Sequence, residues 1–137
     1  KLYLETVTVP ADKDTPTSSI ATLDVTKTYV LKASGVASAC NEVGCNIDFD
    51  ADYAINNEGV QGWINGVEGY LGYGPNLLDL MVNSGFIDWD TDITYNTDHI
   101  YWHALAGTGA PLSLLIYDVY YPNNSGNLLV DIFVKLW

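Results

Sequence analysis

The chain has 137 residues, of which 48% are hydrophobic and only 16% are charged. Five lysines and no arginine stand against 17 Asp and Glu residues, and the net charge of −12 argues against binding to nucleic acid or insertion at an anionic membrane. A chain of this length usually buries roughly 70% of its unfolded surface in one core. We therefore expect a single domain over residues 1–137 that needs no metal in order to fold.

The N-terminal segment predicts a strand over residues 2–9. Strict alternation would place Leu2 and Leu4 on one face and Val7 and Val9 on the other, so this strand is either bulged or covered on both faces. The following segment, residues 10–19, is polar and contains two prolines, which predicts a flexible connector. The strand can therefore begin its own sandwich or leave through the connector and complete the sheet of a neighbouring molecule.

Further along the chain, apolar and β-branched runs alternate with turn-forming clusters of Gly, Asn, Pro and Ser. No segment has a sustained helical period. The pattern predicts an all-β fold, a β-sandwich of the jelly-roll or galactose-binding-like type. The predicted strands are residues 29–34, 47–55, 77–82, 100–104, 112–118 and 128–137.

The segment 47–55 alternates between apolar and acidic residues. As one strand, it would place Asp48, Asp50 and Asp52 on the face opposite the apolar side chains. This face is either solvated or screened by a cation, and Asp50 or Asp52 could supply a calcium ligand to a neighbouring loop. An EF-hand is excluded because the Gly and Glu that its loop requires are missing.

Cys40 and Cys45 are separated by four residues. That spacing can close a disulfide, which would stabilise the fold by about 2 kcal/mol. A zinc site is the poorer alternative, because neither His99 nor His103 stands at ligand spacing. A disulfide favours an oxidising compartment, so we expect a secreted or cell-surface protein.

The sequence offers little support for catalysis. His99 and His103 would point to one face of a strand, but no Ser or Cys nucleophile stands in a recognisable setting. We therefore expect a protein that is not an enzyme. Trp63, Tyr70 and Tyr73 lie in a Gly-rich stretch where a ring could stack on a sugar, and of these Tyr73 is the candidate carbohydrate contact. The alternative for each ring is core packing or a structural hydrogen bond.

The segment from Asp118 to Asn124 connects two predicted strands. Asp118, Asn123 and Asn124 carry hard oxygen donors, and a tight loop can turn the carbonyl of Tyr121 toward them. Ca²⁺ takes six to eight such oxygens. The alternatives are a turn in which these side chains cap their own backbone, and a glycosylation site at Asn123.

Residues 115–118 and 123–132 resemble the C-terminal signature of the calcium-dependent, galactose-specific PA-IL-type bacterial lectins. Weaker similarity extends over residues 29–38 and the turn at 83–85. The resemblance implies a small jelly-roll sandwich in which an Asp, two consecutive Asn and main-chain carbonyls hold calcium, while sugar hydroxyls complete the calcium shell.

Carried over by position, this resemblance implies calcium ligands at Asp118, Asn123 and Asn124, with Tyr121 as the carbonyl donor, and sugar contacts at Asp118 and Asn123. The loop is shorter than in the lectins, and Ala39 stands where the lectins have a Tyr that touches both calcium and sugar. Calcium binding therefore carries over better than galactose binding.

Together these features predict a non-enzymatic, extracellular calcium-binding sandwich. Our first hypothesis is a structural subunit of a self-assembling surface fibre, whose N-terminal strand adds to a neighbour and whose partner is therefore another copy of the chain. The alternative is a soluble calcium-dependent lectin that binds galactose-like carbohydrate.

Overall fold

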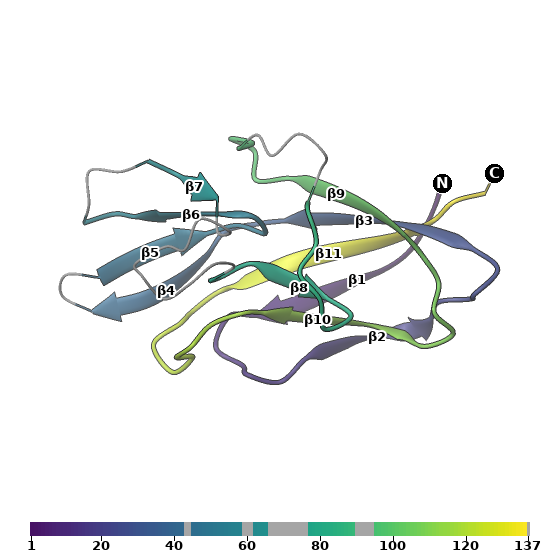
Figure 1. Ribbon diagram of the computed structural model, residues 1–137, viewed down its shortest axis with the longest axis horizontal. Helices are drawn as coiled ribbons and strands as arrows, with labels where there is room; N and C mark the ends of the chain where they lie inside the picture. The colour runs from purple at the N-terminus through teal and green to yellow at the C-terminus, as the bar shows by residue number, and fades with distance from the viewer. Residues whose placement is uncertain (43–44, 59–61, 66–76, 90–94, 137) are drawn as a thin grey trace.

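The computed structural model describes residues 1–42, 45–58, 62–65, 77–89 and 95–136 (Figure 1). In these residues it contains β-strands and no helix, which confirms the all-β prediction, and no helix long and apolar enough to cross a membrane is present among them. The strands are β1 (Leu2–Pro10), β2 (Thr17–Thr22), β3 (Thr28–Ser34), β4 (Ala37–Glu42), β5 (Cys45–Phe49), β6 (Tyr53–Asn56), β7 (Ile64–Asn65), β8 (Leu80–Val82), β9 (Tyr101–Ala106), β10 (Pro111–Ile116) and β11 (Asn127–Val134).

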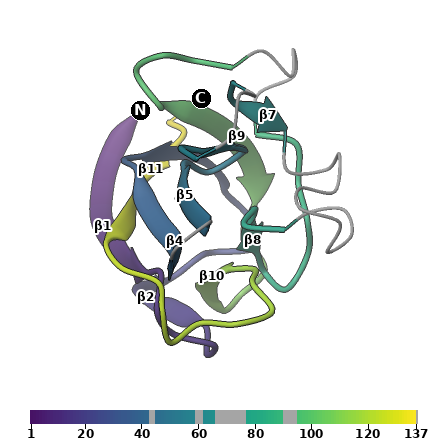
Figure 2. The ribbon, with the colours of Figure 1, turned by 90° about the vertical axis from the view of Figure 1, so that its left-hand side faces the viewer.

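The strands form three antiparallel sheets, with the orders β1-β11-β3-β9, β2-β10-β8 and β4-β5-β6-β7. The view along the strands in Figure 2 shows the first two sheets facing each other across the core. The third sheet extends the sandwich at the end away from the two termini (Figure 1). The fold is thus a β-sandwich, and its finer assignment to the jelly-roll type stays a prediction.

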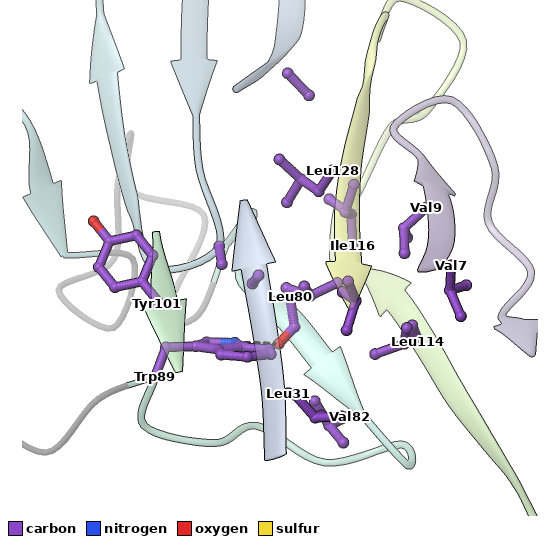
Figure 3. Close-up of a cluster of buried hydrophobic side chains, with 14 of the residues drawn as sticks. Val7, Val9, Leu31, Leu80, Val82, Trp89, Tyr101, Leu114, Ile116 and Leu128 are labelled. Carbon is purple, nitrogen blue, oxygen red and sulfur yellow. Dashed lines mark hydrogen bonds between the residues drawn. The ribbon is translucent and has the colours of Figure 1, made fainter. Parts of the chain in front are cut away.

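The core lies between the two facing sheets because their strands alternate buried and outward-facing side chains. In β11, Leu128, Val130 and Ile132 are buried. Leu114 and Ile116 of β10 are buried as well, and Figure 3 shows these two side chains in one cluster with Leu128. Burying each such side chain stabilises the fold by roughly 1.5–3 kcal/mol relative to leaving it in water. This burial fixes which face of each strand is free for function.

The N-terminal strand β1 pairs with β11 of the same chain. Its register shifts between Tyr3 and Glu5, which favours the bulged strand over the alternative of a strand covered on both faces. The shift places Leu2, opposite Val134, on the same face as Val7, but Leu2 and Leu4 lie at the end of the sheet and are exposed, whereas Val7 and Val9 enter the core. In this structure β1 is the first strand of its own sandwich, and its exchange with a neighbour stays a prediction.

The connector after β1 is shorter than predicted. β2 already begins at Thr17, in the middle of the predicted connector 10–19. Ala11 is buried, and its backbone N–H donates to the carbonyl of Gly126 at 3.0 Å. Only residues 11–16 therefore link the two strands, and their first residue is held against the loop that precedes β11.

Glu5 joins the two facing sheets on the side of β1 and β2. Its carboxylate accepts hydrogen bonds from the backbone N–H groups of Ile20 (3.0 Å) and Ala21 (2.8 Å). These groups lie on β2, an edge strand whose open backbone would otherwise be a template for pairing with another chain. Glu5 therefore covers part of this edge.

The prediction of one continuous strand over residues 47–55 is wrong. β5 ends at Phe49 and β6 begins at Tyr53, and the two strands pair antiparallel across a turn. Asp50 forms this turn because its Oδ1 accepts the N–H groups of Asp52 (2.9 Å) and Tyr53 (2.8 Å). The predicted acidic row on one solvated face is wrong for the same reason, since Asp50 and Asp52 are both buried.

The other predicted strands agree with the structure to within three residues at each end. The sequence pattern predicts no strand at β2 or β4, which are short and rich in Ser, Thr and Ala. The predicted segment 112–118 ends earlier, at Ile116, so that Asp118 lies in the loop before β11.

Candidate functional site

The loop between β10 and β11 is closed by Asp118. Its Oδ1 accepts the backbone N–H groups of Val119 (2.7 Å) and Tyr120 (3.3 Å), and its Oδ2 accepts a hydrogen bond from Nδ2 of Asn124 (2.7 Å). The carboxylate therefore caps its own loop, as the alternative interpretation of this motif predicts. The same contacts bring together two of the predicted calcium ligands.

Asn124 is buried beneath this loop, with 7% of its surface exposed. Its Nδ2 also donates to the carbonyl of Ala11 (2.9 Å), and its backbone N–H donates to the carbonyl of Tyr121 (3.0 Å). Its Oδ1 is buried without a hydrogen-bond partner among the described residues. Leaving a buried acceptor without a partner destabilises the folded protein by about 1–3 kcal/mol, and a bound cation would offset this loss.

Tyr121 supports the base of the loop. Its hydroxyl donates to the carbonyl of Ile116 (2.7 Å) and accepts the N–H of Asp118 (3.0 Å). Burial raises the pKa of this hydroxyl, and the carboxylates of Asp118 and Asp14 raise the pKa further. The neutral phenol thus holds its own carbonyl in place beside Asn124. Asn123, the remaining predicted ligand, is half-buried in the same loop.

A groove with a volume of about 500 Å³ lies between this loop and the β1–β2 connector. The connector contributes Asp12, Lys13 and Asp14 to its wall, and the loop contributes residues 119–122. Tyr120 is 57% exposed there. The groove therefore offers an aromatic ring and carboxylates beside the predicted calcium ligands. It will be called the loop groove.

The other predicted ligands lie in the β5–β6 turn, where Asp50 is completely buried. Besides the two turn N–H groups, its carboxylate accepts a hydrogen bond from the hydroxyl of Tyr101 (2.9 Å) and lies 2.8 Å from Nδ1 of His99. Four partners occupy its oxygens, which gives Asp50 a structural role in joining this turn to the start of β9. Asp52, also buried, stays an untested ligand.

An aromatic cluster surrounds Asp50. The ring of Trp63 stacks on Tyr95 with centroids 5.2 Å apart and lies 4.9 Å from the ring of His99. The ring of Tyr53 packs against the rings of Tyr95 and Tyr101. His99 has a φ of 59°, in the left-handed region. The sequence gives no signal for this cluster, since its members come from four separate segments.

The two histidines do not share a strand face, so that prediction is wrong. β9 begins at Tyr101, after His99, whereas His103 lies inside β9 with its ring 6.0 Å from Trp89. Burial lowers the pKa of His103, which favours the neutral form of this ring.

Asp79, just before β8, is a buried carboxyl outside the predicted sites. Its Oδ1 has no hydrogen-bond partner among the described residues. Burial raises its pKa to about 8, with further contributions from the charges of Asp52, Asp50 and Asp88. At neutral pH this group is therefore mostly protonated. Its setting, Leu-Asp-Leu, gives no sequence signal of burial, because alternation in a strand would place the carboxyl on the face opposite the leucines.

Two further predictions concern Cys40 and Tyr73. Cys40 and Cys45 form the predicted disulfide across the β4–β5 hairpin, with Cα atoms 5.4 Å apart. Tyr73 and Tyr70 lie outside the described residues. Within the part of the chain that the structure describes, no group of three or more His, Cys, Asp or Glu side chains is arranged to hold a metal. A cation at the 118–124 loop would therefore depend on amide and carbonyl oxygens as well as on Asp118.

Comparisons of the chain with protein-family models, with curated proteins and with solved structures found no match.

Proposed function

We propose that this protein is a non-enzymatic, extracellular module that binds calcium at the 118–124 loop and carbohydrate in the adjoining loop groove. The observation that carries the proposal is the buried Oδ1 of Asn124, which lacks a partner among the described residues and belongs to a side chain that is hydrogen-bonded to the Asp118 carboxylate through its Nδ2. The Cys40–Cys45 disulfide supports the extracellular assignment.

The donors in this loop fit Ca²⁺ in kind. Asp118 supplies a carboxylate, Asn123 and Asn124 supply amide oxygens, and Tyr121 supplies a carbonyl oxygen with a second lone pair. These donors fall short of the six to eight oxygens that Ca²⁺ prefers, so water or a ligand would supply the others. The net charge of −12 would also attract a divalent cation.

The loop groove fits a sugar in its chemistry. The exposed ring of Tyr120 presents an apolar face against which the C–H groups of a pyranose can pack. Asp12 and Asp14 can accept hydrogen bonds from its hydroxyl groups. The similarity of the loop to the PA-IL-type signature adds galactose-like sugars as the class to test first.

The calcium site is tested by melting the protein with increasing Ca²⁺. We expect the melting temperature of the wild type to rise and the rise to disappear in Asn124→Ala. Asn57→Ala is the matched control, because Asn57 lies outside the 118–124 loop, donates to Asp48 instead of to a loop residue, and should leave the rise unchanged. Asn124→Ala also removes the two hydrogen bonds that Nδ2 donates. Asn124→Asp is therefore a second variant, because it removes the same two hydrogen bonds but keeps an oxygen ligand, and it should keep the rise. An equal rise in the wild type and Asn124→Ala would place the ion elsewhere.

The carbohydrate site is tested on a glycan array. We expect binding that EDTA abolishes, and Tyr120→Ala should lose this binding while it keeps the calcium-dependent rise in melting temperature. An array without any calcium-dependent signal would remove the carbohydrate part of the proposal and leave the calcium part standing.

A second candidate function is a structural subunit of a surface fibre formed by strand addition. It is favoured by the position of β1, which is an edge strand that ends at a short connector and inserts Val7 and Val9 into the core. The same strand could fill the equivalent place in a neighbour. If this holds, deleting residues 1–9 should leave monomers in negative-stain micrographs of a protein that otherwise forms filaments. Filaments that persist after the deletion would refute strand addition.

A further inference from the structure

A second groove, also of about 500 Å³, lies at the end of the sandwich where the chain begins and ends (Figure 1). We call it the terminal groove. It lies between the start of β1, the start of β3 and the end of β11. Much of its wall is apolar, and Leu2 and Leu136 are 53% and 67% exposed. Its lining includes Leu2, Leu4, Lys27, Tyr29, Val134, Lys135 and Leu136.

Positive charge is scarce in this protein, yet two of its five lysines, Lys27 and Lys135, line the terminal groove. Lys1 and Lys32 lie outside this groove, on the outer face of the same sheet, with their Nζ atoms 4.0 Å and 5.8 Å from the ring centre of Trp102, so the basic rim consists of Lys27 and Lys135. An apolar surface with a basic rim on a chain of net charge −12 is suited to an acidic, apolar partner.

The loop groove at the opposite end has the complementary character. Val119 and Tyr120 are 56% and 57% exposed, and Asp12 and Asp14 flank them with Lys13 as the one cation in the groove. β1 runs from the terminal groove to this end, and its nine residues span roughly 30 Å at about 3.3 Å per residue. One molecule therefore has a basic, apolar surface at the terminal groove and an acidic, apolar surface at the loop groove. The two surfaces lie too far apart to contact each other within the molecule.

We propose that the terminal groove binds the loop-groove end of a second copy of this chain. Val119 and Tyr120 of one copy would enter the apolar wall around Leu2 and Leu136 of the next. Asp12 and Asp14 of the first copy would face the two groove lysines. This contact goes beyond the carbohydrate proposal and needs no exchange of β1.

Because the two surfaces differ, the contact is heterologous and repeats from copy to copy as an open chain. A sugar in the loop groove would occupy the same surface, so ligand binding and self-association would compete. Salt has opposing effects here, since it screens both the charge pairs of the contact and the repulsion between acidic subunits. Charge reversal at constant salt is therefore the sharper test.

The experiment measures association by sedimentation velocity over a concentration series at constant salt. The wild type should form oligomers that grow with concentration. Lys27→Glu/Lys135→Glu makes both ends acidic and should weaken association by at least about tenfold. Asp12→Lys/Asp14→Lys makes both ends basic and should weaken association similarly. Lys32→Glu reverses a charge outside both grooves and should associate as the wild type does.

Mixing the two double variants gives the decisive result. Each variant then meets an oppositely charged end on the other, so the mixture should recover association that neither variant shows alone. Double variants that associate like the wild type, or a mixture that stays monomeric, would overturn the contact. A wild type that stays monomeric at every concentration would overturn it too, while calcium and glycan binding would be unaffected and remain a separate test of the carbohydrate proposal.

Discussion

The buried carboxyl of Asp79 gives a quantitative test of the electrostatics at the centre of the sandwich. Burial and the neighbouring acids raise its pKa from 3.8 to about 8. The unfolded chain, in which Asp79 has its ordinary pKa, ionises this group at lower pH than the folded chain does. Unfolding between these pKa values therefore releases a proton, and the free energy of unfolding falls as the pH rises.

The magnitude follows from the shift itself. The contribution of Asp79 to stability is fully present below pH 3.8 and is lost at about 1.4 kcal/mol per pH unit up to about pH 8. Asp79→Asn cannot ionise and is free of this loss. Between pH 5 and pH 7, the free energy of unfolding of Asp79→Asn should therefore rise relative to the wild type by about 2.7 kcal/mol, which corresponds to roughly 10 °C in melting temperature.

The assay is urea unfolding of both proteins at several pH values, with EDTA present so that no cation competes for the carboxyl. Asp12→Asn, at an exposed position in the connector, is the control and should differ from the wild type by a nearly constant amount. A difference between Asp79→Asn and the wild type that does not change with pH would refute the reasoning. So would a destabilised Asp79→Asn at pH 7, because it would mean that the folded protein uses the ionised carboxylate.

Three further substitutions test single contacts, each by urea unfolding. Gly107→Ala would place a Cβ atom 1.9 Å from a backbone carbonyl oxygen in the β2–β3 loop and should lower the free energy of unfolding by at least about 2 kcal/mol. Gly62→Ala has no atom within 4 Å of its Cβ and should lower it much less. Equal effects of the two substitutions would contradict this reasoning. Replacing Cys40 and Cys45 by Ser should cost about 2 kcal/mol, and reducing the wild type should have the same effect, so a reductant that changes nothing would rule out the stabilising role. Glu5→Ala leaves two backbone N–H groups of β2 without their acceptor and should cost about 1–3 kcal/mol, while a neutral effect would show that water replaces the carboxylate fully.

The fold class follows from the sequence because strand periodicity is a local property. In β3 and β11 every second side chain is apolar and buried, so the pattern of these segments alone identifies a sheet face. The sequence pattern does not predict β2, because only Ser19 of its six residues is buried and most of its side chains are small and polar. β2 forms a strand because it pairs with β10, and the sequence of β2 alone contains no information about this pairing.

The site residues are less predictable because the role of a carboxylate depends on partners that are distant in sequence. Asp50 alternates with apolar neighbours as a solvated strand residue would, yet His99, 49 positions away, lies against it in the core. Alternation fixes the side of the chain on which an acid lies only while the strand continues. Once Asp50 accepts two N–H groups of its own turn, the strand ends, and the predicted placement of Asp52 on a solvated strand face fails with it.

The candidate calcium loop also connects the carbohydrate and fibre hypotheses, because Asn124 donates to the carbonyl of Ala11, 113 positions earlier and directly after β1. If β1 stays in its own sheet, the loop is completed within one molecule, and the calcium-dependent rise in melting temperature should not depend on protein concentration. If β1 passes to a neighbour, Ala11 passes with it, and the loop that holds Asn124 is completed only in the assembly. The rise should then grow with protein concentration and vanish when residues 1–9 are deleted. Measuring the rise at a low and a hundredfold higher protein concentration separates the two cases, and a constant rise rules out strand exchange as the state that binds calcium.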